Sequence, residues 1–224
     1  NSDIVINATE LRTGSAFRFG SRESGCWRFG KVVDNRIPVA KAVAASAAYP
    51  AFLPAIDEKY TFVDGEGVET KKRTILTDGG VYDNLGISCL DPDKSTDYSF
   101  NVFKPKYIIC CSAGQGLFQD NVIPYFALNR MKRSFNSVFR KSQDSGLAKL
   151  HQLAESGKLK GFILPYLGQL DKNLPLIPPD LVRREQVFNY PTDFSQMSID
   201  NIQLLSRRGE QLTRLLIERY VPEL

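Results

Sequence analysis

The chain has 224 residues, with 29 Lys and Arg against 25 Asp and Glu, so its formal net charge is +4 at pH 7. Hydrophobic residues make up 42% of the chain and charged residues 24%, which is typical of a folded domain and excludes wholesale disorder. The small basic surplus argues against a dedicated nucleic-acid binder, and no apolar run reaches the about 20 residues that a transmembrane helix needs.

The cysteines and the first residues indicate a cellular compartment. Cys26, Cys89, Cys110 and Cys111 fit neither a disulfide framework nor a zinc site. Residues 1–30 lack the layout of a signal peptide, so we expect a reducing, cytoplasmic compartment. The chain starts without Met and enters an apolar run at once, so we also expect it to be part of a longer polypeptide.

The first third of the chain predicts short strands and one helix. Residues 3–8 form a β-branched apolar run typical of a strand, and residues 15–29 alternate as a hairpin or an ordered loop does. From Pro38 a run of helix-forming residues predicts a buried helix that Pro50 ends. Residues 57–73 are charged and contain glycines, which indicates a surface loop or hairpin before a strand over residues 74–77.

The rest of the chain adds two strands and two helices. Residues 107–111 form a continuous apolar run typical of a fully buried parallel strand, and residues 162–164 predict a last strand. Helical spacing predicts a helix over residues 122–145, and a long C-terminal helix follows Ser198 as its N-cap. Strands that alternate with helices favour an α/β fold with a largely parallel sheet.

Asp78 directly follows the strand expected over residues 74–77 and precedes Gly79 and Gly80. In open α/β sheets, functional groups gather at the carboxyl ends of strands, where a carboxylate can orient or deprotonate a nucleophile. The alternative is a structural role, since an aspartate in a turn often accepts a hydrogen bond from the N–H two residues on. Local chemistry alone favours the structural role.

Three sequence blocks in the same order resemble the patatin-like phospholipase family. They are Ile6-Asn7-Ala8-Thr9-Glu10-Leu11-Arg12-Thr13-Gly14, Ala45-Ser46-Ala47-Ala48-Tyr49-Pro50-Ala51-Phe52-Leu53-Pro54 and Thr77-Asp78-Gly79-Gly80-Val81-Tyr82-Asp83-Asn84. Residues 190–194 and the closing helix with Arg208-Gly209-Glu210 also resemble bacterial members. The resemblance implies that residues 1–224 are the C-terminal portion of a single patatin-like domain. Its fold would be three-layer α/β/α with a mainly parallel central sheet, and its N-terminal strands would be missing from this chain.

The same resemblance implies a lipid acyl hydrolase of the phospholipase A type, in which Asp78 is the base of a Ser–Asp dyad. Family members carry the serine in a G-x-S-x-G elbow after a Gly-rich oxyanion loop, and this chain has neither. The nearest approach is Ser112, which has Gly114 two residues after it but Cys110 two residues before it. We therefore expect an N-terminal segment or a companion chain to supply the serine and the oxyanion hole.

The implied partners follow from that activity. The substrate would be a glycerophospholipid or another acyl lipid, met at a peripheral membrane surface, with no nucleic-acid partner. No metal or organic cofactor is implied by acyl transfer of this kind. The alternative is a non-catalytic patatin-like interaction module that binds a partner or a lipid surface.

Four other features leave alternatives open. Asn84 can brace the turn that aims Asp78, or it can belong to an ordinary turn. His151 lies in a polar helical stretch and is expected at the surface. The basic, amphipathic residues 129–141 can lie in a membrane interface, although packing of the apolar stripe on the sheet with a solvated basic side is favoured. Cys110 and Cys111 are expected to be buried small hydrophobes on opposite faces of a strand.

Overall fold

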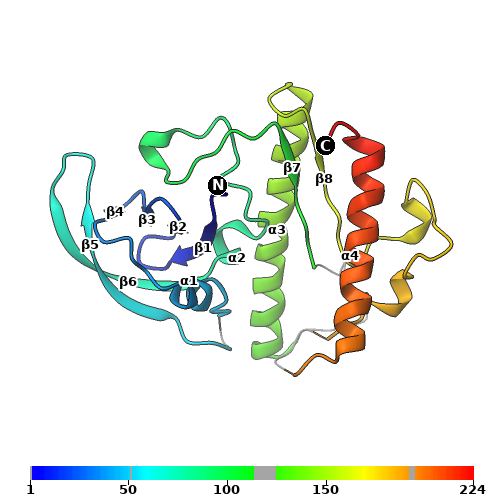
Figure 1. Ribbon diagram of the computed structural model, residues 1–224. Helices are drawn as coiled ribbons and strands as arrows, with labels where there is room; N and C mark the ends of the chain where they lie inside the picture. Colours follow the sequence, from blue (N-terminus) through cyan, green and yellow to red (C-terminus); the bar gives the residue numbers. More distant parts are fainter. Residues whose placement is uncertain (1, 51, 114–124, 192–194) are drawn as a thin grey trace. The chain divides into compact units, whose positions relative to one another are not determined.

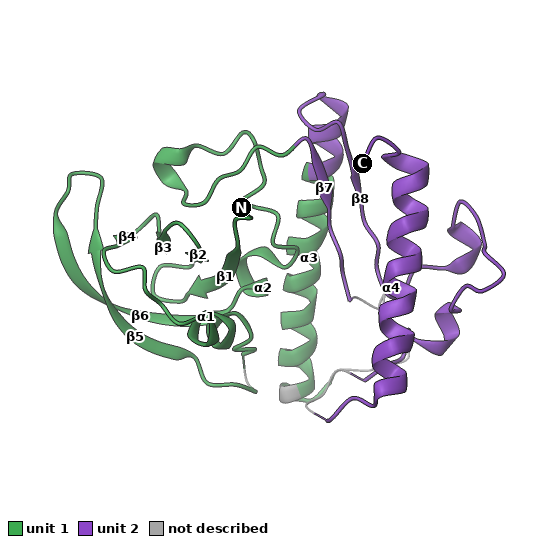
Figure 2. Cartoon of the chain, in the orientation of Figure 1, with its two compact units in different colours: residues 1–105, 124–149 green, residues 106–123, 150–224 purple. Residues whose placement is uncertain are grey.

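The computed structural model describes residues 2–50, 52–113, 125–191 and 195–224, which form two compact units (Figure 1, Figure 2). One unit comprises residues 1–105 and 124–149, and the other comprises residues 106–123 and 150–224. Helix α3 (Ala127–Glu155) contributes to both units. The expectation that residues 1–224 belong to a single domain stays a prediction.

Six strands of the first unit close into an antiparallel barrel. They are β1 (Val5–Glu10), β2 (Ser15–Gly20), β3 (Ser24–Cys26), β4 (Gly30–Val32), β5 (Ile56–Val63) and β6 (Glu69–Asp78). Each strand pairs with the next in the chain, and residues 8–10 of β1 pair with residues 76–78 of β6 to close the barrel.

The predicted three-layer α/β/α fold with a mainly parallel central sheet is therefore wrong. Short turns join β1 to β2, β2 to β3, β3 to β4 and β5 to β6. A short turn leads into an antiparallel neighbour, whereas a parallel neighbour needs a crossover connection of a dozen or more residues. Because β6 pairs with β1, these six strands close the sheet among themselves, and the expected missing N-terminal strands are not part of it.

Most of the strands expected in this unit are confirmed, but with different lengths. The strand expected over residues 3–8 is β1, and the hairpin expected within residues 15–29 is β2 and β3. The charged residues 57–73 form the β5–β6 hairpin, and β6 begins five residues before the predicted strand at residue 74. Lys71 and Arg73 are exposed, which explains why this stretch does not show an apolar pattern.

Helix α1 (Val39–Ser46) begins after Pro38 and ends before Pro50, as predicted. The expectation that the whole helix is buried is wrong, because only Ala42 and Ala45 are buried while Val39 and Val43 are exposed. The small side chains of the two alanines allow the helix backbone to approach the barrel core closely. The helix therefore lies on the barrel with one face in water.

Aromatic rings dominate the core of the first unit. The buried residues of this core are Ala8, Phe17, Phe19, Cys26, Val32, Ala42, Ala45, Phe62 and Leu76. The rings of Phe17 and Phe62 meet edge to face at 6.4 Å, and Phe17 and Phe19 lie 4.7 Å apart. The core is therefore made by side chains from β1, β2, β3, β4, β5, β6 and α1 together.

Two charged side chains are buried against this barrel. Glu10 accepts hydrogen bonds from the N–H (2.8 Å) and hydroxyl (2.7 Å) of Thr13 and from a β6 N–H (3.2 Å). Arg18 donates at 2.8 Å to the hydroxyls of both Ser88 and Ser99. Glu10 thus ties the β1–β2 turn to β6, while Arg18 holds the segment that follows α2 (Gly80–Asp83) and includes η1 (Thr96–Tyr98).

The second unit contains a two-stranded parallel sheet, β7 (Tyr107–Ile109) and β8 (Gly161–Ile163). The parallel pairing is confirmed, but the expectation of a fully buried strand is wrong, since Ile108 is buried and Ile109 is 45% exposed. Cys110 is buried and Cys111 is exposed, so only one of the two matches the expected burial. In a sheet with a single covered face, alternate side chains meet water.

Helix α4 (Ile199–Tyr220) packs on β8 through Leu216, which contacts Ile163. As predicted, Ser198 caps it, and its hydroxyl accepts the Asn201 N–H at 3.3 Å. Arg208 of α4 is fully buried and pairs at 2.8 Å with Asp171 of η2 (Asp171–Asn173). It also donates to the main-chain carbonyls of Gln169, which precedes η2, and of Val182, which lies between η2 and η3 (Arg184–Gln186).

Three sequence predictions fall partly outside the described residues. Helix α3 begins at Ala127, so residues 122–124 of the expected helix are not covered. Residues 192–194 of the segment 190–194 and Ala51 of the second sequence block are also outside. Within the described part of the chain, no helix combines the length and the hydrophobicity that spanning a bilayer requires.

The barrel core predicts a large effect of truncating Phe62, which is fully buried. We expect Phe62→Ala to lower the free energy of unfolding by about 3–5 kcal/mol, because it removes a ring and leaves a cavity. The matched control is Tyr98→Ala, which removes an exposed ring and should change stability by less than about 0.5 kcal/mol. Urea denaturation followed by circular dichroism measures both variants, and equal losses would contradict this core.

Candidate functional site

Asp78 is the last residue of β6, and hydrogen bonds to its main chain hold it on two sides. Its N–H donates to the Ala48 carbonyl at 3.1 Å, and the Gly79 N–H donates to the Ser46 carbonyl at 3.2 Å. On the other side, the Thr9 hydroxyl donates to the Asp78 carbonyl at 2.9 Å. The three sequence blocks, which lie far apart along the chain, therefore meet at Asp78.

Gly79 and Gly80 are required here because neighbouring atoms leave no room for a Cβ, and not because of their backbone conformation. Gly79 has φ −63° and ψ −30°, which any residue adopts. A Cβ on Gly79 would overlap the Asn7 carbonyl oxygen of β1, and a Cβ on Gly80 would stand 2.6 Å from Phe139 Cε1. The two glycines let the turn pass between β1 and α3.

The Asp78 carboxylate is oriented by its own turn. Oδ1 accepts the Gly80 N–H at 2.7 Å, which is the structural role that local chemistry favours. In the described part of the chain, no hydrogen bond reaches Oδ2, and the side chain is partly exposed. One oxygen thus fixes the direction of the carboxylate while the other can accept a proton, so the structural and catalytic roles are compatible.

Burial changes the acidity of this carboxylate. Burial raises the pKa of Asp78, and the hydrogen bond from Gly80 opposes that rise. The pKa of Tyr49 is also raised, first by its burial and then by the negative charge of Asp78. A raised pKa makes the carboxylate a stronger base for a hydroxyl proton.

An aromatic cluster, Tyr49, Phe52, Phe135 and Phe139, lies next to Asp78. The Tyr49 ring centroid is 5.7 Å from Phe52, 5.8 Å from Phe135 and 6.0 Å from Phe139. The Tyr49 hydroxyl donates to Asn136 Oδ1 at 3.1 Å, which holds the ring against α3. The cluster offers an apolar surface beside a carboxylate, an arrangement that suits a substrate with an acyl chain near its reacting bond.

Asn84 lies in the same turn as Asp78, at the C-terminal end of α2. Its Oδ1 is 2.7 Å from the point where a Cβ on Gly80 would stand, and Asp78 Oδ1 is 3.0 Å from that point. No hydrogen bond joins Asn84 to Asp78 among the described residues. Asn84 can therefore support the turn around Gly80, but it does not hold the carboxylate directly.

His151 and Ser112 both belong to the second unit. His151 is exposed on α3, as predicted, and its ring meets Phe162 edge to face at 4.9 Å. Ser112 follows β7, and its N–H donates to the Pro165 carbonyl at 3.0 Å. Gly114, the glycine that gives Ser112 its partial likeness to an elbow, lies outside the described residues.

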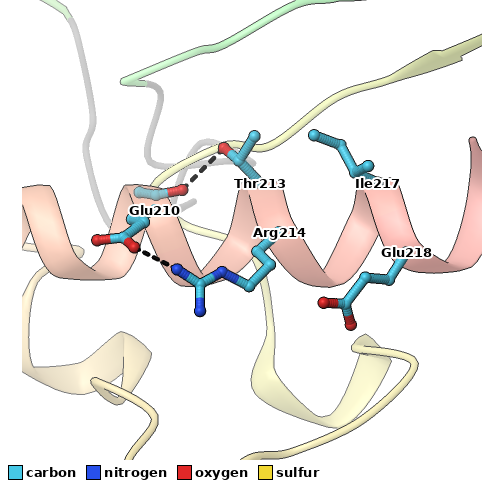
Figure 3. Close-up of a pocket in the computed structure, with 6 residues that line it drawn as sticks. Glu210, Thr213, Arg214, Ile217 and Glu218 are labelled. Carbon is cyan, nitrogen blue, oxygen red and sulfur yellow. Dashed lines mark hydrogen bonds and ion pairs between the residues drawn. The ribbon is translucent and has the colours of Figure 1, made fainter. Parts of the chain in front are cut away.

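The surface of α4 has a hollow of about 540 Å³, shown in Figure 3. Its lining residues are Gly209, Glu210, Thr213, Arg214, Ile217 and Glu218, all from this one helix. Arg214 pairs with Glu210 at 2.5 Å, and the Thr213 hydroxyl donates to the Gly209 carbonyl at 2.8 Å. Arg214 and Glu210 therefore neutralise each other, and the Thr213 hydroxyl is bound to the main chain of its own helix.

The described residues hold no cluster of three or more His, Cys, Asp or Glu side chains that could bind a metal ion. Sequence reasoning assigned no role to Glu10, Arg18 or the aromatic cluster. The spacing of Phe135 and Phe139, four residues apart on an expected helix, was a signal for an aromatic contact. No local signal paired them with Tyr49, since that contact spans more than 80 residues of sequence.

Comparisons of the chain with protein-family models, with curated proteins and with solved structures found no match in any of the three. None of them indicates a patatin-like family. The resemblance therefore stays a prediction that rests on the three sequence blocks.

The close approach at Gly79 can be tested by adding one methyl group. We expect Gly79→Ala to lower the free energy of unfolding by roughly 1–3 kcal/mol, because its Cβ would overlap the Asn7 carbonyl. Gly65→Ala is the matched control, since a Cβ there meets no atom within 4 Å. Thermal and urea unfolding measure both; a Gly79→Ala protein as stable as the control would show that the turn does not pass β1 so closely.

The raised pKa of Asp78 predicts a pH dependence of protein stability opposite to that of an aspartate in an ion pair, whose pKa is lowered. At a pH between the ordinary pKa of 3.8 and the raised pKa, Asp78 is ionised in the unfolded chain but still protonated in the folded protein. The free energy of unfolding therefore falls as pH rises through this range. We expect Asp78→Asn to remove that fall in stability. Carboxyl NMR titration should place Asp78 above 3.8 and the exposed, Arg36-paired Asp34 at about 2. A midpoint at or below 3.8 for Asp78 would contradict its burial.

Proposed function

We propose that the protein is a lipid acyl hydrolase of the phospholipase A type, in which Asp78 is the base of a Ser–Asp dyad. The observation that carries this proposal is the carboxylate itself: Oδ1 accepts the Gly80 N–H, and among the described residues no hydrogen bond reaches Oδ2, which can therefore accept a proton. Its raised pKa and the neighbouring aromatic cluster support the same role.

The reaction requires one carboxylate that accepts a proton in each of its two halves. Asp78 takes the hydroxyl proton as the serine oxygen bonds to the ester carbonyl carbon, and it returns that proton to the departing alcohol. In the second half, Asp78 takes a proton from water as the water oxygen bonds to the acyl carbon, and the serine leaves with that proton. The products are an alcohol and a fatty acid.

The serine has to come from outside residues 1–224, since no serine in this sequence stands in a G-x-S-x-G elbow. The proposal therefore needs a further segment or a companion chain that brings a hydroxyl within about 2.6–3.2 Å of Asp78 Oδ2. The same segment would supply the N–H donors for the oxyanion. The partial exposure of Asp78 leaves room for that approach.

The aromatic cluster supports a lipid substrate over a small polar ester. Phe52 is largely exposed, and the rings of Phe135 and Phe139 continue the apolar surface from it through Tyr49. Contact with these rings would remove acyl-chain methylenes from water, at about 0.8 kcal/mol for each CH₂ that is buried. Longer acyl chains should therefore bind more tightly.

The absence of an elbow serine from the sequence favours a second candidate, a non-catalytic interaction module that binds a partner or a lipid surface. In that case the turn at Asp78 would be structural only, through its hydrogen bond from Gly80. The two candidates differ in whether the intact protein hydrolyses an acyl ester at all.

The test is Asp78→Asn in the intact protein, with every segment or chain that accompanies residues 1–224. We expect ester hydrolysis to fall by about 10²- to 10⁴-fold, since an amide keeps the Gly80 hydrogen bond but cannot accept the serine proton. The control is Asp57→Asn, which removes an exposed carboxylate paired with Arg73 and should leave hydrolysis unchanged. Circular dichroism confirms that both variants fold.

Full activity in Asp78→Asn would rule out Asp78 as the base. A folded wild-type protein that hydrolyses neither short-chain nor long-chain esters would favour the interaction module instead.

A further inference from the structure

The first part of α3 concentrates positive charge. Residues 127–143 contain the five cations Arg130, Lys132, Arg133, Arg140 and Lys141 and no Asp or Glu. Those five positive charges exceed the net charge of +4 of the whole chain. This charge is therefore a local property of α3 and not a share of a general basic surplus.

Two exposed apolar side chains stand among these cations. At 100° per residue, Arg130, Met131, Val138 and Lys141 fall within an arc of about 100° around the helix. Met131 is 65% exposed and Val138 is 60% exposed, and Arg130 and Lys141 are exposed beside them. One face of α3 thus carries both cations and apolar side chains in contact with water.

This face adjoins the side of α3 that packs on the rest of the first unit, since Phe135 lies about 40° around the helix from Met131. Phe135 and Phe139 point to Tyr49, and a Cβ on Gly146 would touch Leu85 and Ile87. The apolar stripe of this helix is expected to pack on the sheet; in the structure its two phenylalanines pack on Tyr49, which follows α1. Met131 and Val138, by contrast, are mostly exposed to water.

More exposed apolar groups adjoin the N-terminal end of α3. Tyr125 and Phe126 directly precede the helix and are 81% and 75% exposed. Phe52, also largely exposed, lies beneath the Lys132 ammonium, with 5.7 Å between the nitrogen and the ring centroid. We call these four residues, together with Arg130, Met131, Val138 and Lys141, the interfacial surface. Lys132 lies about 100° around the helix from Met131, beyond Phe135 and Phe139, so this surface borders the aromatic cluster.

Cations interleaved with exposed apolar side chains match the chemistry of an anionic bilayer. Lys and Arg are attracted to anionic headgroups, while aromatic and aliphatic side chains enter the boundary between headgroups and acyl chains. A soluble polyanion would bind the cations but gain nothing from Met131 and Val138. The combination of the two therefore selects a lipid surface.

We propose that the interfacial surface binds the headgroup region of an anionic phospholipid bilayer. The proposal names a partner for the proposed hydrolase and in that sense rests on that function, because it would bring the enzyme to a layer of acyl lipids. Binding does not require hydrolysis, so the two can be measured apart.

The test is co-sedimentation of the intact protein with vesicles of phosphatidylcholine and phosphatidylglycerol in equal parts, compared with phosphatidylcholine alone. Binding should require the anionic lipid. It should weaken when salt rises from about 0.1 M to about 1 M, because the Debye length falls from about 10 Å to about 3 Å. Absence of binding to the anionic vesicles at low salt would overturn the proposal.

A charge variant and its control locate the surface. Each Lys or Arg near an anionic membrane strengthens binding about fivefold, so Arg130→Gln with Lys132→Gln and Lys141→Gln should weaken it on the order of 100-fold. Glutamine keeps helix propensity close to that of Lys and Arg, so the helix is retained. The control replaces the exposed Lys59, Lys71 and Lys160 by Gln, removing the same charge elsewhere. Equal losses in the two variants would contradict the location.

An apolar variant separates a membrane from a soluble polyanion. Met131→Ser with Val138→Ser keeps every charge and should weaken vesicle binding at least severalfold, whereas Val39→Ser with Val68→Ser, also exposed, should not. If the Met131 and Val138 variant binds vesicles as the wild type does, the surface is an electrostatic site for phosphate groups in general and the proposal is wrong.

Hydrolysis of a water-soluble short-chain ester distinguishes this proposal from the proposed function. If the protein hydrolyses this ester but does not bind the vesicles, the proposed membrane-binding role of the interfacial surface is wrong and the proposed hydrolase activity is supported. If the intact protein binds anionic vesicles as described but hydrolyses no ester, the proposed membrane-binding surface is supported and the proposed hydrolase activity is wrong.

Discussion

The carbonyl oxygen of Ala48 holds the arrangement around Asp78 together. It accepts two hydrogen bonds, from the Thr77 hydroxyl at 2.7 Å and from the Asp78 N–H at 3.1 Å. Because Ala48 follows α1 and Thr77 belongs to β6, these bonds join the helix to the barrel at the point where β6 also pairs with β1. The direction of the Asp78 carboxylate depends on that junction, since a strand end that shifted would carry the carboxylate with it.

The same junction gives Asp78 two different surroundings. The Gly80 N–H provides a hydrogen bond to Oδ1, and the aromatic rings of Tyr49 and Phe139 lie nearby. The hydrogen bond lowers the pKa of the carboxylate and burial raises it, with burial the larger effect. A carboxylate that is oriented and yet partly desolvated is a better proton acceptor than one in open water, which is what a Ser–Asp dyad without a histidine demands.

The strand end at Asp78 was predicted correctly, whereas the predicted fold class is wrong. The position of Asp78 at the end of a strand was predictable, because an apolar run followed by Asp-Gly-Gly indicates a strand and a sharp turn. The barrel was not predictable in this way, because the order of strands along the sequence does not determine which strands pair. In β6, exposed side chains such as Lys71 and Arg73 hid the alternation, so a ten-residue strand read as a charged loop with a short strand after it. The contact of Tyr49 with α3 depends on the fold and has no local signature.

Labelling of the intact protein with a fluorophosphonate probe, read by intact mass and peptide mapping, tests whether Asp78 activates a serine outside residues 1–224. We expect a labelled serine outside residues 1–224 and loss of labelling in Asp78→Asn. A folded protein that takes no label, a label on a serine within residues 1–224, or labelling that is indifferent to Asp78→Asn would contradict this expectation.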